Sequence, residues 1–163
     1  ISNVFQFIQK FFAAVDPIIF KNRGVIDKKT GDGMLAFCGD SEDATPKDAA
    51  LSAVQAAYEI QKQLAGLPPE YFGSGQPVKA RIGVNTGEVM IGNAGSEKHF
   101  NYTVLGDAVN FTQRLEAACE PGGVLVGEKT ASYIRERWKL EKVEIRIKHE
   151  DHPVVAYKVI API

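Results

Sequence analysis

Two long stretches with helical spacing of apolar residues, each followed by short strand-like segments, constrain the fold of this chain more than any other feature. Residues 2–20 place phenylalanine, isoleucine and valine at intervals of three and four, and residues 45–66 continue an apolar stripe after a Thr-Pro helix start. Between them, residues 25–28 and 34–37 predict two strands around a turn at 31–33. Helices that alternate with antiparallel hairpins predict an α+β sandwich in which one face of the sheet is covered.

The second half of the chain predicts a series of shorter elements. A stretch rich in glycine and proline at 66–77 is expected to be a surface loop and not a domain boundary, because a strand pattern resumes directly after it. The expected elements are a hairpin of residues 78–85 and 89–91 around Thr86-Gly87, a helix over 107–119, a strand over 124–126, and two closing strands over 143–147 and 154–160. Residues 1–163 are therefore expected to form one domain.

Composition and charge argue against several classes of protein. The 19 basic and 20 acidic residues give a net charge of −1 without blocks of like charge, so the basic surface of a nucleic-acid-binding protein is not expected. No apolar run approaches the roughly 20 residues that cross a bilayer, and the chain does not begin with the pattern of a signal peptide. Cys38 and Cys119 lack Cys-x-x-Cys spacing and are expected to be buried free thiols, which indicates a cytoplasmic domain.

The Gly31-Asp32-Gly33 turn admits two interpretations. Glycine and aspartate are common in tight turns, and in that interpretation the segment is only a hairpin tip. In the other interpretation, glycine lets the backbone approach a phosphate and Asp32 offers a hard oxygen ligand to Mg²⁺. A single carboxylate is rarely a complete magnesium site, so the functional interpretation requires a partner.

Asn110 and Arg114 form a second candidate group. They lie four residues apart on the helix expected over 107–119, and therefore share one helix face beside the apolar stripe. From this face both side chains can reach one ligand. The same spacing also fits a solvent-exposed face, so the pair alone does not decide between the two interpretations.

Four segments in the second half of the chain resemble the core of class III adenylate and guanylate cyclases. They are RIGVNTGEV at 81–89, GNAGS at 92–96, YTVLGDAVN at 102–110 and RLE at 114–116. The resemblance extends from the first helix to the last strand, and the Asp32 hairpin falls where that family has a metal-binding aspartate. It implies a ferredoxin-like nucleotide cyclase fold, with helices packed on an antiparallel-rich sheet and with the opening strand missing from this sequence.

The resemblance also implies roles for individual residues. Asp32 would bind metal, in a site where two Mg²⁺ or Mn²⁺ ions engage the triphosphate. Lys28 and Thr103 would contact the purine. The catalytic positions, which hold the ribose and stabilise charge on the phosphates, would be Asn110, Arg114 and Lys148.

Lys28 favours ATP over GTP on physical grounds. Adenine N1 is an acceptor that pairs with a donor such as lysine, whereas guanine carries a hydrogen at N1 and would face Lys28 with a second donor. Wrong pairing of this kind changes selectivity by orders of magnitude. Together with the resemblance, this pairing predicts an adenylate cyclase that makes cyclic AMP and pyrophosphate, and a guanylate cyclase acting on GTP is the alternative.

The sequence departs from the family's pattern in two places. Next to Lys148, His149 stands where the family usually has glycine, and Glu150 replaces a second lysine. His149 and His152 also permit a metal interpretation, beside that of a solvated connection between strands. The other metal-binding aspartate is expected upstream of Ile1, so the given chain is expected to be N-terminally incomplete and weak or inactive.

A homodimer with shared active sites is a further implication of the resemblance. One subunit would supply Asp32 and the missing aspartate, and the other would supply the purine-, ribose- and phosphate-binding side chains. The parent protein is expected to carry regulatory domains, and its membrane anchoring is left open. A non-catalytic regulatory or dimerisation domain is the main alternative, and a diguanylate cyclase is disfavoured because its Gly-Gly-Asp/Glu-Glu-Phe turn is absent.

Overall fold

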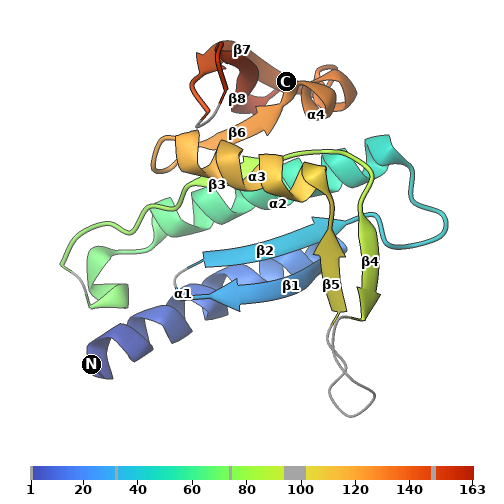
Figure 1. Cartoon of the computed structure of the whole chain (residues 1–163). Coiled ribbons are helices and arrows are strands. Elements are labelled where there is room, and N and C mark those ends of the chain that lie inside the picture. The colour runs from blue at the N-terminus through green and yellow to red at the C-terminus, as the bar shows by residue number, and fades with distance from the viewer. Residues whose placement is uncertain (1, 32, 74, 94–101, 148–149) are drawn as a thin grey trace.

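The structure, a computed structural model shown in Figure 1, describes residues 2–31, 33–73, 75–93, 102–147 and 150–163. Its helices are α1 (Ser2–Lys21), α2 (Pro46–Gly66), the 3-10 helix η1 (Pro69–Phe72), α3 (Asp107–Ala118) and α4 (Glu128–Ile134). Its strands are β1 (Gly24–Thr30), β2 (Gly33–Cys38), β3 (Ile82–Val84), β4 (Met90–Asn93), β5 (Tyr102–Leu105), β6 (Val124–Gly127), β7 (Trp138–Ile145) and β8 (Val154–Pro162). The α+β class expected from the sequence is confirmed.

The two long helices and the first hairpin form where the sequence predicts them. Thr45 is the N-cap of α2, where its hydroxyl accepts a hydrogen bond from Asp48 N at 3.1 Å, and Pro46 begins the helix. β1 and β2 pair antiparallel around the turn that follows Thr30. α1, β1, β2 and α2 therefore follow from local sequence pattern alone.

The strands form three hydrogen-bonded groups, β1–β2, β3–β6–β8–β7 and β4–β5. The hairpin expected across Thr86-Gly87 is wrong, because β3 pairs in parallel with β6 and β4 pairs antiparallel with β5. Contacts with α3 explain the difference. Asn85 donates from Nδ2 to Ala108 O at 3.0 Å, and a Cβ added at Gly87 would lie 2.7 Å from Ala108 Cβ. Residues 85–87 thus lie against α3 instead of turning back on β3.

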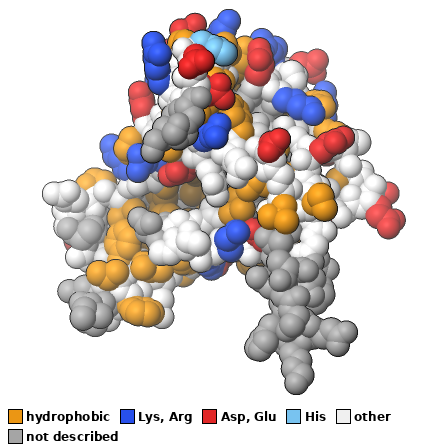
Figure 2. Space-filling view, viewed as in Figure 1, with side chains coloured by type: hydrophobic (Ala, Val, Ile, Leu, Met, Phe, Trp, Pro, Cys, Tyr) orange, Lys and Arg blue, Asp and Glu red, His pale blue; other side chains and the backbone are white. Residues whose placement is uncertain are grey.

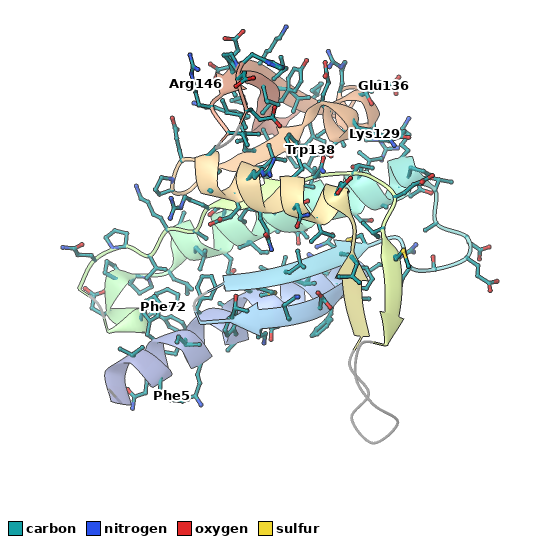
Figure 3. The ribbon with its side chains drawn as sticks, in the orientation of Figure 1. Phe5, Phe72, Lys129, Glu136, Trp138 and Arg146 are labelled. Atoms are coloured by element: carbon teal, nitrogen blue, oxygen red, sulfur yellow. The ribbon has the colours of Figure 1, made fainter. Side chains whose placement is uncertain are left out.

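The main core lies on both faces of β6, whereas the sequence pattern predicts helices on one face of the sheet only. Val124 and Val126 pack with α2 and α4 in one cluster, while Leu125 packs with Leu115 of α3 in another. A strand with apolar residues at successive positions needs cover on both sides. Trp138 of β7 closes the first cluster, where its ring meets that of Tyr58 with 5.0 Å between centroids (Figure 3).

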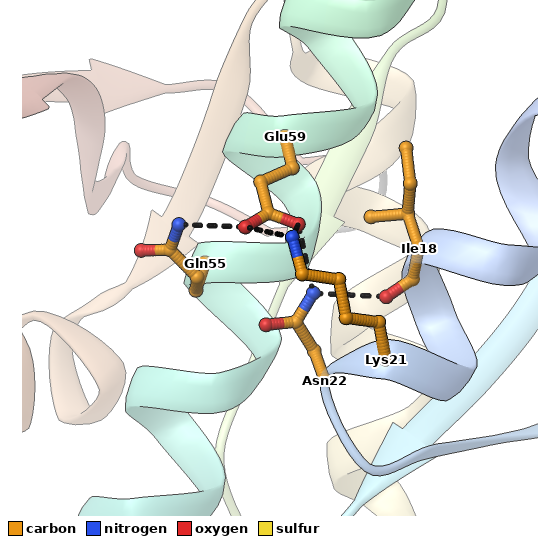
Figure 4. A network of polar contacts seen from close by, with 5 residues as sticks. All are labelled: Ile18, Lys21, Asn22, Gln55 and Glu59. Carbon is orange, nitrogen blue, oxygen red and sulfur yellow. Dashed lines mark hydrogen bonds and ion pairs between the residues drawn. The ribbon is translucent and has the colours of Figure 1, made fainter.

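A polar network joins the end of α1 to the middle of α2 (Figure 4). Asn22 donates from Nδ2 to Ile18 O at 2.8 Å and to Glu59 Oε2 at 3.1 Å, and Gln55 donates from Nε2 to Glu59 Oε1 at 3.0 Å. Lys21 adds an ion pair to the same carboxylate at 3.4 Å. The hydrogen bond from Gln55, followed by those from Asn22 and Lys21, holds the pKa of Glu59 below its ordinary value.

Three short elements were not expected from the sequence: η1, β5 and α4. η1 lies in the stretch expected to be a loop. Its Phe72, labelled in Figure 3, is buried, and its ring centroid lies 5.6 Å from that of Phe7 in α1. β7 begins at Trp138, five residues before the strand expected over 143–147. Such short segments carry too few periods of apolar residues to be assigned from pattern alone.

Both cysteines are free, as expected. Cys119 is buried, whereas Cys38 is half-buried. Desolvation by burial, with the charge of Asp40 as a smaller cause, raises the pKa of the Cys38 thiol to about 11.

Charged and hydrophobic side chains gather on different parts of the surface (Figure 2). Acidic and basic side chains intermingle over the upper part of the view, which is built by β7, β8 and α4, and hydrophobic side chains gather at the lower left over α1. Val4 and Phe5 of α1 are 61% and 68% exposed. No helix in the described part of the chain has the length and apolar character to span a bilayer.

Candidate functional site

The position of α3 depends on a glycine in the strand beneath it. A Cβ added at Gly83 would lie 2.5 Å from Glu116 N and 2.8 Å from Thr112 O, so α3 lies directly on the backbone of β3. Gly106, with a φ of 146°, connects β5 to α3 in a conformation that favours glycine. α3 is thereby fixed between two strands, with Leu115 fully buried.

A cleft of about 330 Å³ lies between the β1–β2 hairpin, β5 and the first turns of α3. The hairpin contributes Lys28 and Leu35, β5 contributes Val104 and Leu105, and α3 contributes Asn110 and Gln113. Figure 1 shows β1, β2, β5 and the start of α3 converging on this region from distant parts of the chain. The cleft therefore combines an apolar wall with polar side chains from two separate elements.

Two predicted site residues, Lys28 and Asn110, meet in this cleft. The Lys28 side chain is 53% exposed, and its Nζ lies 3.9 Å from Asp27 Oδ2. The side-chain amides of Asn110 and Gln113 have no hydrogen-bond partner within the ranges that the structure describes. One cation and two amides are consequently available to a ligand, and Asp107 adds an acidic residue to the lining of the cleft.

Arg114 lies one turn after Asn110 on the same face of α3 and does not line the cleft itself. Its side chain is 46% exposed, and Nη1 lies 4.0 Å from Glu150 Oε1. An ion pair of this length between exposed groups is weak and can be exchanged for a stronger anion. The guanidinium is therefore able to bind a charged extension of a ligand held in the cleft.

The other predicted site residues lie wholly or partly outside the described residues. Asp32, Lys148 and His149 are outside them. Thr103 is placed through its backbone in β5, opposite Gly92 of β4, and its side chain lies outside the described part. These three predicted site residues, Asp32, Thr103 and Lys148, remain predictions.

Within the described ranges, no group of three or more acidic, histidine or cysteine side chains could hold a metal ion. The described residues alone therefore do not make a metal site of the kind that the sequence suggests. Asp32, the candidate ligand, is not among them.

The chemistry of the cleft fits a flat heterocycle with a hydrogen-bond acceptor. Leu35 and Val104 offer apolar surface, and Lys28 offers a charged donor beside it. Asn110 can both donate and accept, as a ribose hydroxyl requires. A larger cavity of about 500 Å³ lies elsewhere, beside Gln55, Glu136 and Trp138, and contains none of the predicted site residues.

Two residues at this site, Gly83 and Gln113, are not predicted by the sequence. Gly83 belongs to the RIGVNTGEV segment, but its close contact with α3 depends on the fold. Gln113 lines the cleft one residue before Arg114. Its position three residues after Asn110 on a helix was the signal that could have identified it.

Comparison with known sequences identifies relatives over almost the whole chain. The family described as "Adenylate and Guanylate cyclase catalytic domain" matches residues 2–159. The uncharacterized protein Rv1318c of Mycobacterium tuberculosis is 32% identical over 160 residues, which cover 94% of this chain and 28% of that protein. The uncharacterized protein Rv1319c of the same organism is 35% identical, over 89% of this chain and 27% of its own length. The chain thus spans just over a quarter of these relatives.

Solved structures share the fold. The guanylyl cyclase Cya2 superposes with a TM-score of 0.86 at 32% identity, over 99% of this chain and 82% of the other. The adenylyl cyclase CyaB from P. aeruginosa superposes with a TM-score of 0.83 at 30% identity, over 94% and 80%. The two identities are nearly equal, so overall similarity does not distinguish between the two substrates.

Proposed function

This chain belongs to the family of adenylate and guanylate cyclase catalytic domains, and from that premise we propose that it converts ATP to 3′,5′-cyclic AMP and pyrophosphate in intracellular signalling. The family supports a lyase that makes cyclic nucleotides. We propose ATP as the substrate and a role in binding or catalysis for each site residue.

The placement of Lys28 carries the proposal. Its side chain lines a cleft that Leu35 and Val104 make apolar, and Asn110 of α3 lines the same cleft. An adenine ring in this cleft presents N1 as an acceptor to Lys28, whereas guanine presents N1–H and leaves two donors opposed. Thr103 on β5 is the proposed second purine contact, on the basis of the sequence resemblance.

The proposed reaction is an intramolecular displacement. The ribose 3′-oxygen forms a bond to the α-phosphorus, the bond from that phosphorus to the oxygen bridging to the β-phosphorus breaks, and pyrophosphate leaves. The 3′-hydroxyl proton is lost to solvent, and no oxidation or reduction occurs. Asn110 would orient the ribose, and Arg114 and Lys148 would stabilise charge on the phosphates. During binding, Arg114 exchanges Glu150 for the triphosphate.

Cyclase domains of this family generally use divalent metal ions. We assign two Mg²⁺ or Mn²⁺ ions to a site that includes Asp32, on sequence resemblance, and such ions would neutralise charge on the triphosphate. The described residues alone do not form that site. Among the described residues, the proposal therefore assigns purine, ribose and phosphate binding, and not metal binding.

GTP is the second candidate substrate, because a guanylyl cyclase is as similar to the chain as an adenylyl cyclase. A direct test incubates the purified protein and any longer natural form with ATP or GTP and Mn²⁺, and measures cyclic product by chromatography. Cyclic AMP is the expected main product. A preference for GTP would refute the proposal that ATP is the substrate. If no form of the protein gave a cyclic product, a regulatory domain would be favoured.

Charge reversal at Lys28 sharpens this test. In Lys28→Glu the carboxylate accepts a hydrogen bond and no longer donates one, so selectivity should move toward GTP by roughly tenfold or more. Lys29→Glu is the matched control, because Lys29 lies on the same strand but pairs with Asp16 of α1. The control should leave the ratio of the two products unchanged.

Cyclase domains bind a nucleotide and often dimerise, and we propose that this protein forms a homodimer with shared sites. One subunit would contribute Asp32, and the other would contribute Lys28, Asn110 and Arg114. Mixing Asp32→Ala and Arg114→Ala proteins should then restore activity that neither has alone. Sites built within one subunit would give no recovery in any mixture. Regulatory domains are proposed for the parent protein, since the relatives are much longer than this chain.

A further inference from the structure

Asp27, next to Lys28 on β1, is an unusual residue for a protein interior. Its side chain is only 1% exposed, and neither carboxylate oxygen has a hydrogen-bond partner among the described residues. Lys28 Nζ lies 3.9 Å from Oδ2, which is an ion-pair distance but too long for a hydrogen bond. A buried carboxylate without hydrogen bonds destabilises the fold, so its presence calls for another explanation.

A β-bulge brings Asp27 and Lys28 to the same side of the hairpin. Ile26 pairs with Ala36 and Lys28 pairs with Leu35, so the register shifts at Asp27. In a bulge, two residues of one strand oppose one residue of the other. Leu35 lines the cleft, and the 3.9 Å contact agrees with Asp27 and Lys28 both lying on that side of β1.

The next lysine on the strand shows the contrasting arrangement. Lys29 pairs with Met34 in the hairpin and extends toward α1, where it forms an ion pair with Asp16 and lies over the Phe12 ring at 4.3 Å from its centroid. Lys29 is therefore held by structural contacts on the α1 side. Within the described part of the chain, the Asp27 carboxylate accepts no hydrogen bond, and its ion-pair contact is with Lys28 of the cleft.

We propose that Asp27 is a positioning residue, which holds the Lys28 ammonium group at the purine end of the cleft and thereby increases discrimination between adenine and guanine. The inference rests on the proposed function of the cleft. A lysine side chain has four rotatable bonds. The Asp27 carboxylate, 3.9 Å from Nζ, favours those conformations in which the ammonium group stays close to it. The carboxylate acts through Lys28 and, being buried, does not contact the nucleotide.

The test measures nucleotide binding without turnover. Binding of 3′-deoxy-ATP and 3′-deoxy-GTP, which cannot cyclise, is followed by calorimetry with Mg²⁺ for the wild type, Asp27→Asn, Lys28→Met and the double variant. Asp27→Asn should weaken 3′-deoxy-ATP binding by about 5- to 10-fold and Lys28→Met by at least about 10-fold, the range of a charged hydrogen bond. Binding of 3′-deoxy-GTP should change less than twofold in Asp27→Asn, and the double variant should match Lys28→Met.

A thermal unfolding measurement separates positioning from a structural role. Because Asp27→Asn removes a buried charge without hydrogen bonds, its midpoint should equal or exceed that of the wild type. Asp16→Asn is the matched control: it should lower the midpoint, since Lys29 loses its partner, and leave the ratio of the two affinities unchanged. A lower midpoint in Asp27→Asn with equal loss of both affinities would mean a structural residue and would overturn the proposal.

The remaining outcomes distinguish the inference from the proposed function. If Lys28→Met changes neither affinity, the purine site itself is wrong. If Lys28→Met lowers the affinity for 3′-deoxy-ATP but Asp27→Asn does not, only the positioning role is wrong. A selective loss of 3′-deoxy-GTP binding in Asp27→Asn would mean direct contact between Asp27 and the base, and would also overturn the inference.

Discussion

Two cavities among the described residues differ in the hydrogen bonds that their side-chain amides make. In the larger one, of about 500 Å³, the amides of Asn22 and Gln55 already donate to Glu59 at 3.1 and 3.0 Å and join α1 to α2. In the smaller one, of about 330 Å³, the amides of Asn110 and Gln113 have no partner within the described residues. The smaller cleft is thus the better candidate for binding, because its amides, unlike those of the larger cavity, are still available to a ligand.

The elements that line the two cavities differ as well. The larger cavity is lined by elements whose contacts stabilise the fold, including Trp138 of the main core. The smaller is lined by the β1–β2 hairpin on one side and by β5 and the start of α3 on the other, and these two parts of the chain meet through long-range packing. Variants in the smaller cleft should therefore lower activity without lowering stability, and variants around the larger cavity should do the reverse.

The largest effect is expected at Arg114. Arg114→Ala removes a cation from the developing charge on the phosphates, so the turnover number should fall roughly 100- to 1,000-fold. The unfolding midpoint should stay within about 2 °C of the wild type, since the side chain is 46% exposed and its ion pair with Glu150 is weak. Steady-state kinetics, on whichever natural form shows cyclase activity, and calorimetry measure both.

The matched control for Arg114 lies in the wall of the larger cavity. Arg137→Ala removes the same group from that wall and should leave turnover unchanged. Equal losses of activity in the two arginine variants would contradict the distinction between the cavities.

The next effect is expected where α3 lies on β3. In Gly83→Ala the new Cβ would be 2.5 Å from Glu116 N, so α3 must shift, at a cost of about 1–3 kcal/mol in the free energy of unfolding. Because Asn110 and Arg114 move with the helix, activity should fall as well. Gly66→Ala is the control, since nothing lies within 4 Å of its added Cβ. If Gly83→Ala were as stable and active as the control, α3 would not be fixed in this way.

A smaller effect is expected from Glu150. Glu150→Gln removes the carboxylate that competes with phosphate for Arg114, 4.0 Å away. The KM for ATP should fall about 2- to 5-fold at low ionic strength, with little change at high salt, because exposed charges are screened. A higher KM in the variant would mean that Glu150 assists binding.

The smallest effect concerns the network at the larger cavity. The pKa of Glu59 is lowered, chiefly by the hydrogen bond from Gln55, so its contribution to stability is present above the unfolded pKa of about 4.3. It is lost as the pH falls through the lower folded value. Glu59→Gln should therefore unfold with a weaker pH dependence below about pH 4.5, as denaturant titrations at several pH values would show. Turnover at neutral pH should be unaffected.

Local pattern was sufficient for the long helices and the first hairpin, because each contains several periods of apolar residues or a glycine turn. It also identified the strands expected over 124–126 and 154–160, but it was insufficient for the pairing of the strands between Val78 and Asp107. Residues 82–84 and 90–93 are too short to specify a partner, and packing against α3 directs them to β6 and β5. The hairpin expected there was wrong for that reason.

The candidate site shows a similar limit. Lys28 and Asn110 could be identified from motif and helix spacing, and the structure brings them to one cleft. The role proposed for Asp27 could not be predicted from the sequence, because burial of its carboxylate and the lack of a hydrogen-bond partner among the described residues are properties of the folded chain. Asp32, Thr103 and Lys148 stay predictions from the sequence.

A crystal structure of the protein with 3′-deoxy-ATP is the most direct test of whether the smaller cleft holds the substrate. We expect the adenine ring against Leu35 and Val104, with Lys28 Nζ within hydrogen-bond distance of N1 and the triphosphate next to Arg114. A nucleotide bound in the larger cavity beside Gln55 and Trp138, or an adenine ring turned away from Lys28, would contradict this assignment.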